Sequence, residues 1–192
     1  MHTLSPDRLR INEHAINTLR KLFARFGSLT LGEHCSQQEH ARQCATLAQL
    51  QGSERSLICA AFLHDIGHLQ ALDANIPGTG AEGHPDHDRI GAQLLRELGF
   101  SAAVYQPVAK HVEAKRYLAG DEAEYQDKLS RTSENSLNIQ GGAMCAVARG
   151  EFLQSPYARE AIQLRRWDEG GKQQELEIPG VEYWLTLCLE EL

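Results

Sequence analysis

The sequence feature that most constrains the fold is the apolar run Ala60-Ala61-Phe62-Leu63, which continues into His64-Asp65-Ile66-Gly67-His68. The run is typical of a buried helix, and unpaired charge at a buried helix end is strongly disfavoured. A metal would stabilise such groups, because His64 offers a nitrogen and each carboxylate oxygen of Asp65 can bind a different ion, as in two-metal sites. For this pair alone, a capped helix end that faces water is the alternative.

Helical spacing of apolar residues recurs along the rest of the chain. Leu9 to Phe26 form one such segment, and Ser36-Gln37-Gln38-Glu39 is a capping box that begins another. Further helices are predicted at about 53–65, 86–98, 101–119, 121–129, 155–168 and 181–192, with a glycine- and proline-rich loop at 69–84. No stretch alternates apolar and polar residues over a useful strand length. The sequence therefore predicts a single all-α domain.

Length and charge limit the classes of function that the chain can have. The chain has 192 residues and a formal charge of −7, which disfavours nucleic-acid and membrane-surface partners. No apolar run approaches the roughly 20 residues that span a bilayer, and no signal core is visible. The five cysteines are odd in number and form no C-x-x-C pair, which is typical of reduced thiols. We expect a cytoplasmic protein with a small-molecule partner; the oligomeric state stays open.

Histidines and aspartates gather at predicted helix ends and on apolar helices: His40, His64, Asp65, His87, His111 and Asp168. Any one of these histidines alone is more often a hydrogen-bonded side chain than a metal ligand. Together, four imidazoles and two carboxylates can fill two metal sites with nitrogen and oxygen donors. Such a set suits iron, manganese or a similar divalent metal.

The order of these residues resembles the H…HD…H…H…D pattern of the HD-domain superfamily, whose members are helical bundles that hold two metals. Most are phosphohydrolases, and a smaller branch uses a mixed-valent Fe(II)/Fe(III) pair with O₂. Three segments are similar to the phosphonate-degrading dioxygenases of that branch, the group typified by 2-amino-1-hydroxyethylphosphonate dioxygenase: Phe62–His68, His87–Ala92 (H-x-x-x-G-A) and His111–Leu118 (H-V-x-A-K-R-Y-L). The resemblance covers about residues 30–170, with helices at both ends expected to pack on this core.

The resemblance implies a role for each candidate residue. One iron would be held by His40, His64, Asp65 and Asp168, and the other by Asp65, His87 and His111, with Asp65 bridging. His68 would be a donor close to the substrate, and Glu33, seven residues before His40, would meet a substrate amino group; Asp65, His68 and Glu33 are the catalytic candidates.

Substrate binding is predicted for a further set of polar residues: Lys115, Ser133, Ser136 and Arg165. Lys115 lies one helical turn after His111, and Arg165 one turn before Asp168, so each shares a face with a ligand. Such residues would meet a phosphonate dianion in an acidic protein. The alternative for Lys115 and Arg165 is a solvated helix face.

The sequence leaves open which cationic group the substrate carries. The family carries an iron-capping tyrosine three residues before the glutamate, where this chain has Thr30. The smaller side chain leaves room for a trimethylammonium group as well as an amine. The resemblance implies oxygen-dependent cleavage of the carbon–phosphorus bond, which gives phosphate and glycine or glycine betaine. An HD phosphohydrolase acting on a nucleotide or small phosphomonoester is the alternative, and a catalytically dead HD scaffold is a third.

Overall fold

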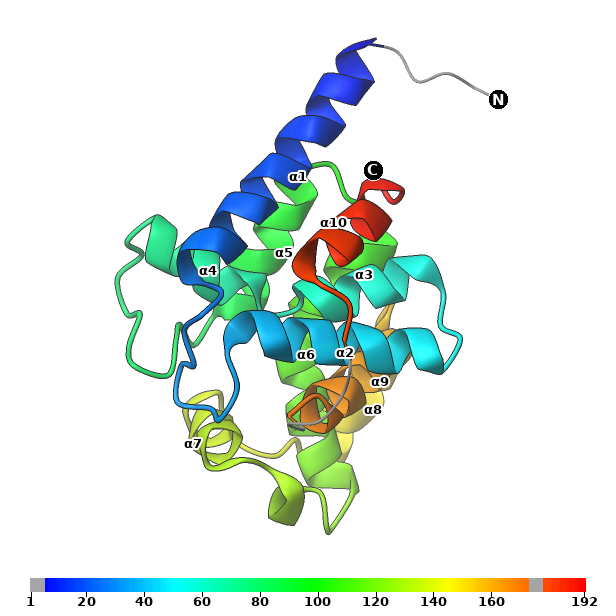
Figure 1. The fold of residues 1–192 in the computed structure, drawn as a ribbon. Coiled ribbons are helices and arrows are strands. Elements are labelled where there is room, and N and C mark those ends of the chain that lie inside the picture. The colour runs from blue at the N-terminus through cyan, green and yellow to red at the C-terminus, as the bar shows by residue number, and fades with distance from the viewer. Residues whose placement is uncertain (1–5, 173–177) are drawn as a thin grey trace.

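The structure is a computed structural model that describes residues 6–172 and 178–192, and within them the fold is all helical (Figure 1). Its elements are α1 (Pro6–Phe26), α2 (Gln37–Leu50), α3 (Arg55–Leu63), α4 (Ile66–Asp73), α5 (His87–Glu97), α6 (Ala102–Asp121), the 3₁₀ helix η1 (Gln126–Lys128), α7 (Arg131–Ile139), α8 (Ala146–Gln154), α9 (Ala158–Gly170) and α10 (Val181–Leu189). The predicted all-α class is confirmed; β structure in the described part is one isolated bridge, Gly80 to Gly83.

Helix α3 lies at the centre of the core. Every residue from Ile58 to Leu63 is buried, as the apolar run predicts. α3 packs against α2, α6, α9 and α10, and α6 in turn packs against α5 and α9. Burial of so apolar a helix on all sides stabilises the bundle through the hydrophobic effect. It also fixes the position of its C-terminal end, where His64 and Asp65 follow.

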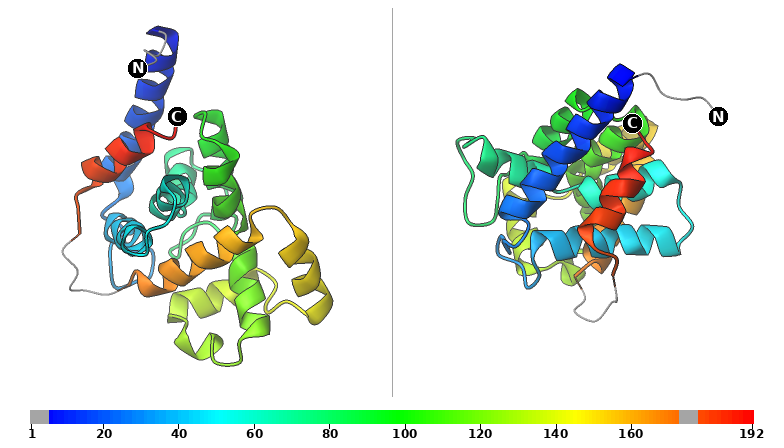
Figure 2. Two further views of the ribbon diagram at one scale, coloured as in Figure 1. Left: turned by 90° about the vertical axis from the view of Figure 1, so that its right-hand side faces the viewer. Right: turned by 45° about the horizontal axis from the view of Figure 1, so that its top comes forward.

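The helices from the two ends of the chain lie side by side across α3. α1 packs against α10 and α4, and both views in Figure 2 show α1 and α10 adjacent. The rings of Phe23 and Phe62 stack with centroids 4.9 Å apart, and Phe62 also lies 6.2 Å from Trp184. These aromatic contacts join both terminal helices to the helix that ends at the candidate site. None of the described helices is long and apolar enough to cross a membrane.

Two predicted boundaries are wrong. The expected loop at 69–84 begins only after Asp73, because α4 continues through the buried Leu69 and Ala71. The expected helix at 121–129 is absent: α6 continues to Asp121, and only the three residues of η1 follow. Leu118 and Ala119 are buried, so packing extends α6 past the point where Gly120 suggested an end. Helices α7 and α8 were not predicted from the sequence.

Candidate metal centre and substrate cavity

The predicted ligands come together from five places in the helical bundle. The capping box predicted at Ser36 is present: the Ser36 hydroxyl accepts the Glu39 N–H, and the Glu39 carboxylate accepts the Ser36 N–H at 2.9 Å. This cap begins α2, so His40 lies in its first turn. The remaining ligands come from the α3–α4 junction, the start of α5, the middle of α6 and the end of α9: His64, Asp65, His87, His111 and Asp168.

Two glycines let α5 approach the α3–α4 junction. A Cβ on Gly67 would lie 1.9 Å from the His87 carbonyl oxygen, and a Cβ on Gly91 would lie 3.1 Å from the Gly67 nitrogen. Only glycine permits so close an approach between backbones. Gly67 and Gly91 therefore allow the backbones that carry Asp65 and His87 to lie close enough for these two side chains to meet.

The Asp65 carboxylate lies at the centre of the group. Its Oδ2 faces the Nε2 atoms of His40 (3.7 Å) and His64 (3.3 Å). Its Oδ1 faces the Nε2 atoms of His87 (3.4 Å) and His111 (3.7 Å). Asp168 closes the first side, with its Oδ1 3.1 Å from His40 Nε2 and its Oδ2 3.9 Å from His64 Nε2. One carboxylate thus separates two groups of nitrogen donors.

All four of these imidazoles are oriented in the same way, because each Nδ1–H donates to a backbone carbonyl. The pairs are His40 with Gly171 (2.9 Å), His64 with Ala61 (2.9 Å), His87 with His84 (3.0 Å) and His111 with Val108 (2.7 Å). A hydrogen bond at Nδ1 fixes the tautomer and leaves the Nε2 lone pair for a metal. The backbone therefore directs four lone pairs toward Asp65.

Two observations show that cations fit this site. His64 Nε2 is fully buried and has no hydrogen-bond partner among the described residues, which is costly unless something binds it. His87 Nε2 and His111 Nε2 lie 3.0 Å apart, so two lone pairs face each other. Burial lowers the pKa of both His87 and His111, so neither imidazole supplies a proton between them. A metal ion on each side of Asp65 would satisfy these nitrogens.

The carboxylates keep their negative charge in this buried place. Burial raises the pKa of Asp65, but the neighbouring imidazoles, His64 above all, outweigh it and hold that pKa well below its usual range. Burial likewise opposes ionisation of Asp168, and the Arg165 guanidinium overcomes it. For His64, burial is outweighed by Asp65 and Asp168, which raise its pKa to about 9. Without a metal this nitrogen binds a proton that an ion would displace.

His68 has the opposite tautomer. Its Nδ1 accepts the His84 backbone N–H at 3.0 Å, and Gly83 permits this approach, since a Cβ there would lie 2.1 Å from His68 Nδ1. Burial keeps the pKa of His68 well below its usual value, so the ring is neutral. Its proton therefore lies on Nε2, 4.0 Å from Asp65 Oδ1. His68 is therefore a hydrogen-bond donor beside the centre, unlike the four imidazoles whose Nε2 lone pairs face Asp65.

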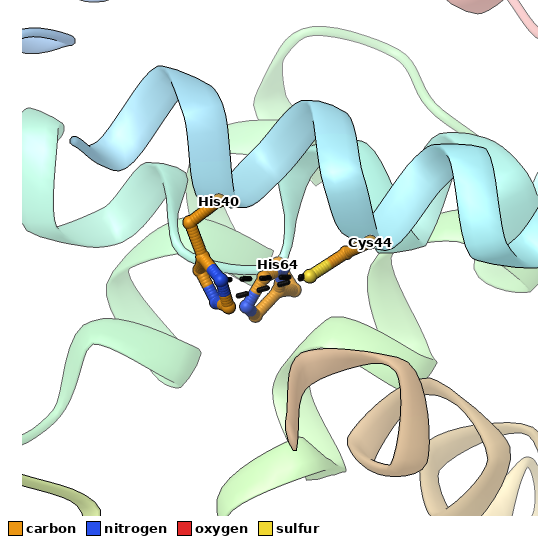
Figure 3. A group of neighbouring side chains, drawn as sticks. All are labelled: His40, Cys44 and His64. Carbon is orange, nitrogen blue, oxygen red and sulfur yellow. Dashed lines mark hydrogen bonds between the residues drawn. The ribbon is translucent and has the colours of Figure 1, made fainter. Parts of the chain in front are cut away.

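Cys44 also lies near the centre, and the sequence did not indicate it. Figure 3 shows its sulfur beside His40 and His64. The sulfur is 3.7 and 3.8 Å from the two ring nitrogens of His40, and its S–H donates to the Trp167 carbonyl at 3.5 Å. Burial raises the pKa of Cys44 well above its usual value, so it is a thiol. A thiol that donates to a carbonyl packs against the ligands without competing as a thiolate.

A cavity of about 490 Å³ opens on the centre. Its walls are the loop that precedes α2, the loop that precedes α5, α7, the middle of α6 and the end of α9. It is lined by Asp65, His40, His87 and Asp168 and by every residue predicted to contact substrate: Glu33, His68, Lys115, Ser133, Ser136 and Arg165. The structure thus brings four of the six predicted ligands and all of the predicted substrate contacts to one cavity.

Lys115 is 2 % exposed, so the solvated-face alternative for this residue is wrong. Its Nζ donates to the Ser136 hydroxyl at 2.7 Å, and it forms no ion pair with any carboxylate of the described residues. Burial first, and then the positive charge of Arg165, lower the pKa of Lys115 to about 7. A buried ammonium without a carboxylate partner is a ready binding group for an anion.

Arg165 is 4 % exposed and is held from several sides, so the solvated-face alternative is wrong here too. Its guanidinium pairs with Asp168 and Glu169 and donates to the Tyr125 hydroxyl at 3.0 Å and the Ser133 hydroxyl at 3.3 Å. Arg165 therefore connects a proposed ligand with a cavity serine, and most of its charge is already paired.

Glu33 has a partner that the sequence did not reveal. Lys172 Nζ lies 2.8 Å from Glu33 Oε1, and the Ser130 hydroxyl donates to the same oxygen at 2.7 Å. The spacing of Lys172, four residues after Asp168, would have been the only signal for it. Thr30, at the place of the family's capping tyrosine, is exposed and does not line the cavity; its carbonyl accepts the Glu33 N–H at 2.9 Å.

Comparison with known proteins agrees with this geometry. Residues 38–168 match the model of the HD domain, so the chain belongs to the HD-domain family. Among similar proteins, the hydroxymethylphosphonate dioxygenase of Gimesia maris is 37% identical over 178 residues, which cover 91% of this chain and 88% of that protein. The [1-hydroxy-2-(trimethylamino)ethyl]phosphonate dioxygenase (glycine-betaine-forming) of Leisingera caerulea is 35% identical over 93% of this chain and 90% of its own length. The resemblance to the phosphonate dioxygenase branch is confirmed.

Proposed function

We propose that this protein is an iron-dependent oxygenase that uses O₂ to cleave the carbon–phosphorus bond of a 1-hydroxyphosphonate, giving phosphate and a carboxylate. One observation carries the proposal: the two oxygens of Asp65 face separate groups of imidazole nitrogens, at 3.3–3.7 Å. Two relatives that cover about nine-tenths of the chain are phosphonate dioxygenases. The buried cation Lys115 in the same cavity is suited to a phosphonate.

The proposed ligand sets follow from the two sides of Asp65. One metal would be held by His40, His64, Asp65 and Asp168, and the other by Asp65, His87 and His111. Nitrogen and carboxylate donors of this kind suit iron. A mixed-valent Fe(II)/Fe(III) pair would supply activation of O₂ and removal of hydrogen from the hydroxyl-bearing carbon; this chemistry belongs to the metals, while the chain positions the substrate and limits water.

The phosphonate would be held at the Lys115 side of the cavity. Ser133 Oγ accepts from both Arg165 and Lys172, so its own O–H is directed elsewhere and can donate to a phosphonate oxygen. Lys115 adds a charge-assisted hydrogen bond. His68, with its proton on Nε2 beside Asp65, can donate to a substrate oxygen at the metals. These contacts would fix the carbon that reacts next to the centre.

The second substituent of the substrate decides the carboxylate product. An amino substrate would give glycine and a trimethylammonio substrate would give glycine betaine, the product named for the Leisingera caerulea relative. The relative from Gimesia maris is named for hydroxymethylphosphonate, which carries no cation.

A cytoplasmic location stays a proposal, supported by five free cysteines, four of them buried.

The test is anaerobic loading with iron followed by oxygen-electrode traces and phosphate assays. With a 1-hydroxyphosphonate, we expect O₂ uptake and phosphate release in equal amounts. A phosphohydrolase of the same family would use the same ligands, but it would release phosphate from a phosphomonoester without O₂. Phosphate release from a phosphomonoester under argon would therefore overturn the oxygenase proposal. A loaded protein that releases no phosphate from either compound class would favour a catalytically dead scaffold.

A further inference from the structure

One end of the cavity, formed by the loop before α2, the start of α7 and Lys172, contains an internal ion pair. Besides the proposed ligands Asp65 and Asp168, the carboxylates among the described lining residues are Glu33 and Glu82. Glu82 is exposed and accepts from Asn135 at 3.2 Å. Glu33 is the more buried of the two, with its side chain 15% exposed. Glu33 is thus the carboxylate that a cationic substrate group inside this cavity would meet.

The position beside that carboxylate is already occupied by a lysine of the chain. Lys172 Nζ lies 2.8 Å from Glu33 Oε1 and 3.1 Å from each of the hydroxyl oxygens of Ser130 and Ser133. An ammonium has three hydrogens to donate, so all three are used. Ser130 donates to the same Glu33 oxygen. The ammonium, the carboxylate and the two hydroxyls form a hydrogen-bonded network on the cavity wall.

The charges around this network disfavour a second cation. Lys172 and Arg165 both donate to Ser133, and Lys115 donates to Ser136, one turn further along α7. Arg165 is balanced by Asp168 and Glu169, and Lys172 is balanced by Glu33. Lys115 has no paired carboxylate among the described residues. Lys115 is therefore the cation that remains for one phosphonate, and an ammonium group beside Glu33 would have to displace Lys172.

We propose that Lys172 is a specificity-determining residue that neutralises Glu33, so that the preferred substrate is a 1-hydroxyphosphonate whose second substituent is uncharged, such as hydrogen or a hydroxyalkyl group. The inference rests on the proposed oxygenase function and narrows its substrate class. Selection acts through repulsion: a lysine at this place disfavours an ammonium and leaves the binding of an uncharged substituent unaffected. For hydroxymethylphosphonate the products are formate and phosphate, with both atoms of O₂ incorporated.

The experiment compares three compounds with the iron-loaded protein: hydroxymethylphosphonate, 2-amino-1-hydroxyethylphosphonate and its N-trimethyl analogue. Wild-type kcat/KM is expected to be highest for hydroxymethylphosphonate, by roughly tenfold or more over either cationic compound. Lys172→Met keeps the length of the side chain and removes its charge. This variant should raise kcat/KM for the cationic compounds by roughly tenfold and leave an uncharged substrate within a few-fold. Lys172→Arg, which keeps the charge, should retain the wild-type preference.

Lys21→Met, at an exposed position on α1, is the matched control and should change none of the three values. A wild-type preference for a cationic compound would overturn the role of Lys172, even though oxygenase activity would stand. An unchanged preference in Lys172→Met would overturn that role as well. Absence of O₂ uptake with all three compounds would instead reject the proposed function. Thermal melting of each variant verifies that a change in preference is measured on folded protein.

Discussion

The two ends of the cavity are built by different means. At the metal end, four imidazoles are held by hydrogen bonds to backbone carbonyls. Their carriers are the buried α3, the helices α2 and α6 that pack on it, and α5, which packs on α6. At the opposite end, charged and hydroxyl side chains hold one another: Lys172, Glu33, Ser130 and Ser133 form a network with few backbone contacts. The helix that carries Ser133 and is capped by Ser130, α7, lies outside the main core cluster.

Because of this difference, the metal end is the more rigid of the two and the opposite end the more easily changed by substitution. A ring fixed through a backbone carbonyl keeps its direction unless the helix itself moves, which suits ligands that must converge within tenths of an ångström. A network of side chains can be rearranged by one substitution, which suits substrate selection. We therefore expect changes at the metal end to abolish activity and changes at the opposite end to alter substrate preference and KM.

The largest effect is expected at the residue that joins the two metal sites. Asp65→Ala removes both oxygens that face the imidazoles, so the chain should lose metal from both sites. Loss of a ligand's hydrogen-bond partner alone costs about 10–100-fold, so kcat should fall by more than about 10³-fold. Elemental analysis and O₂ uptake measure the two effects. Asp73→Ala, which removes a surface partner of Arg25, is the control and should retain both metals; full metal content in Asp65→Ala would contradict the bridge.

The next effect is expected at Lys115. Lys115→Met removes a charge-assisted hydrogen bond to the phosphonate, and such a bond contributes about 1.5–3 kcal/mol, so KM should rise about 10–100-fold. Metal content should not change, because Lys115 is not a proposed ligand. Steady-state kinetics and elemental analysis measure the two quantities, and an unchanged KM would place the phosphonate elsewhere in the cavity.

The pH dependence gives a second test of Lys115. Its pKa of about 7 in the substrate-free protein means that the ammonium is present below that pH and is lost above it. Because kcat/KM reports the ionisation of the free enzyme, it should fall as pH rises above about 7. Lys115→Arg stays charged and should remove this falling limb even if it lowers the maximum. An unchanged profile in Lys115→Arg would assign the limb to another group.

The metal end was largely predictable from sequence, and the opposite end only in part. His40, His64, Asp65, His87, His111 and Asp168 were predicted because each lies at a helix end or on an apolar helix, where an ionisable group needs a partner. Lys172 was not predicted, because it follows two glycines and its partner Glu33 is 139 residues away. Helices α7 and α8 were missed for a related reason: each buries only one or two side chains, so helical spacing of apolar residues is weak there.

A smaller effect is expected at Cys44, whose sulfur lies beside two proposed ligands. If Cys44 only packs there, Cys44→Ala should retain both metals and lose about 1–2 kcal/mol of unfolding free energy, because it leaves a small cavity. Asp168→Ala is the matched comparison and should lose the metal on its side of Asp65. Elemental analysis and thermal melting measure both variants. Loss of one metal from Cys44→Ala, with retention in Asp168→Ala, would exchange the roles of the two residues.

The smallest effect compares two helix caps, one at each end of the cavity. Ser36 caps α2 and Ser130 caps α7, and each accepts a backbone N–H of its helix. Replacing either with alanine should cost about 1 kcal/mol of unfolding free energy. Ser36→Ala should leave KM within twofold, since the His40 ring is held separately by the Gly171 carbonyl. Ser130→Ala also removes a hydroxyl from the network of Glu33 and Lys172, so KM should change several-fold. Equal KM values in the two variants would contradict a role of the Ser130 hydroxyl in substrate binding beyond its function as a helix cap.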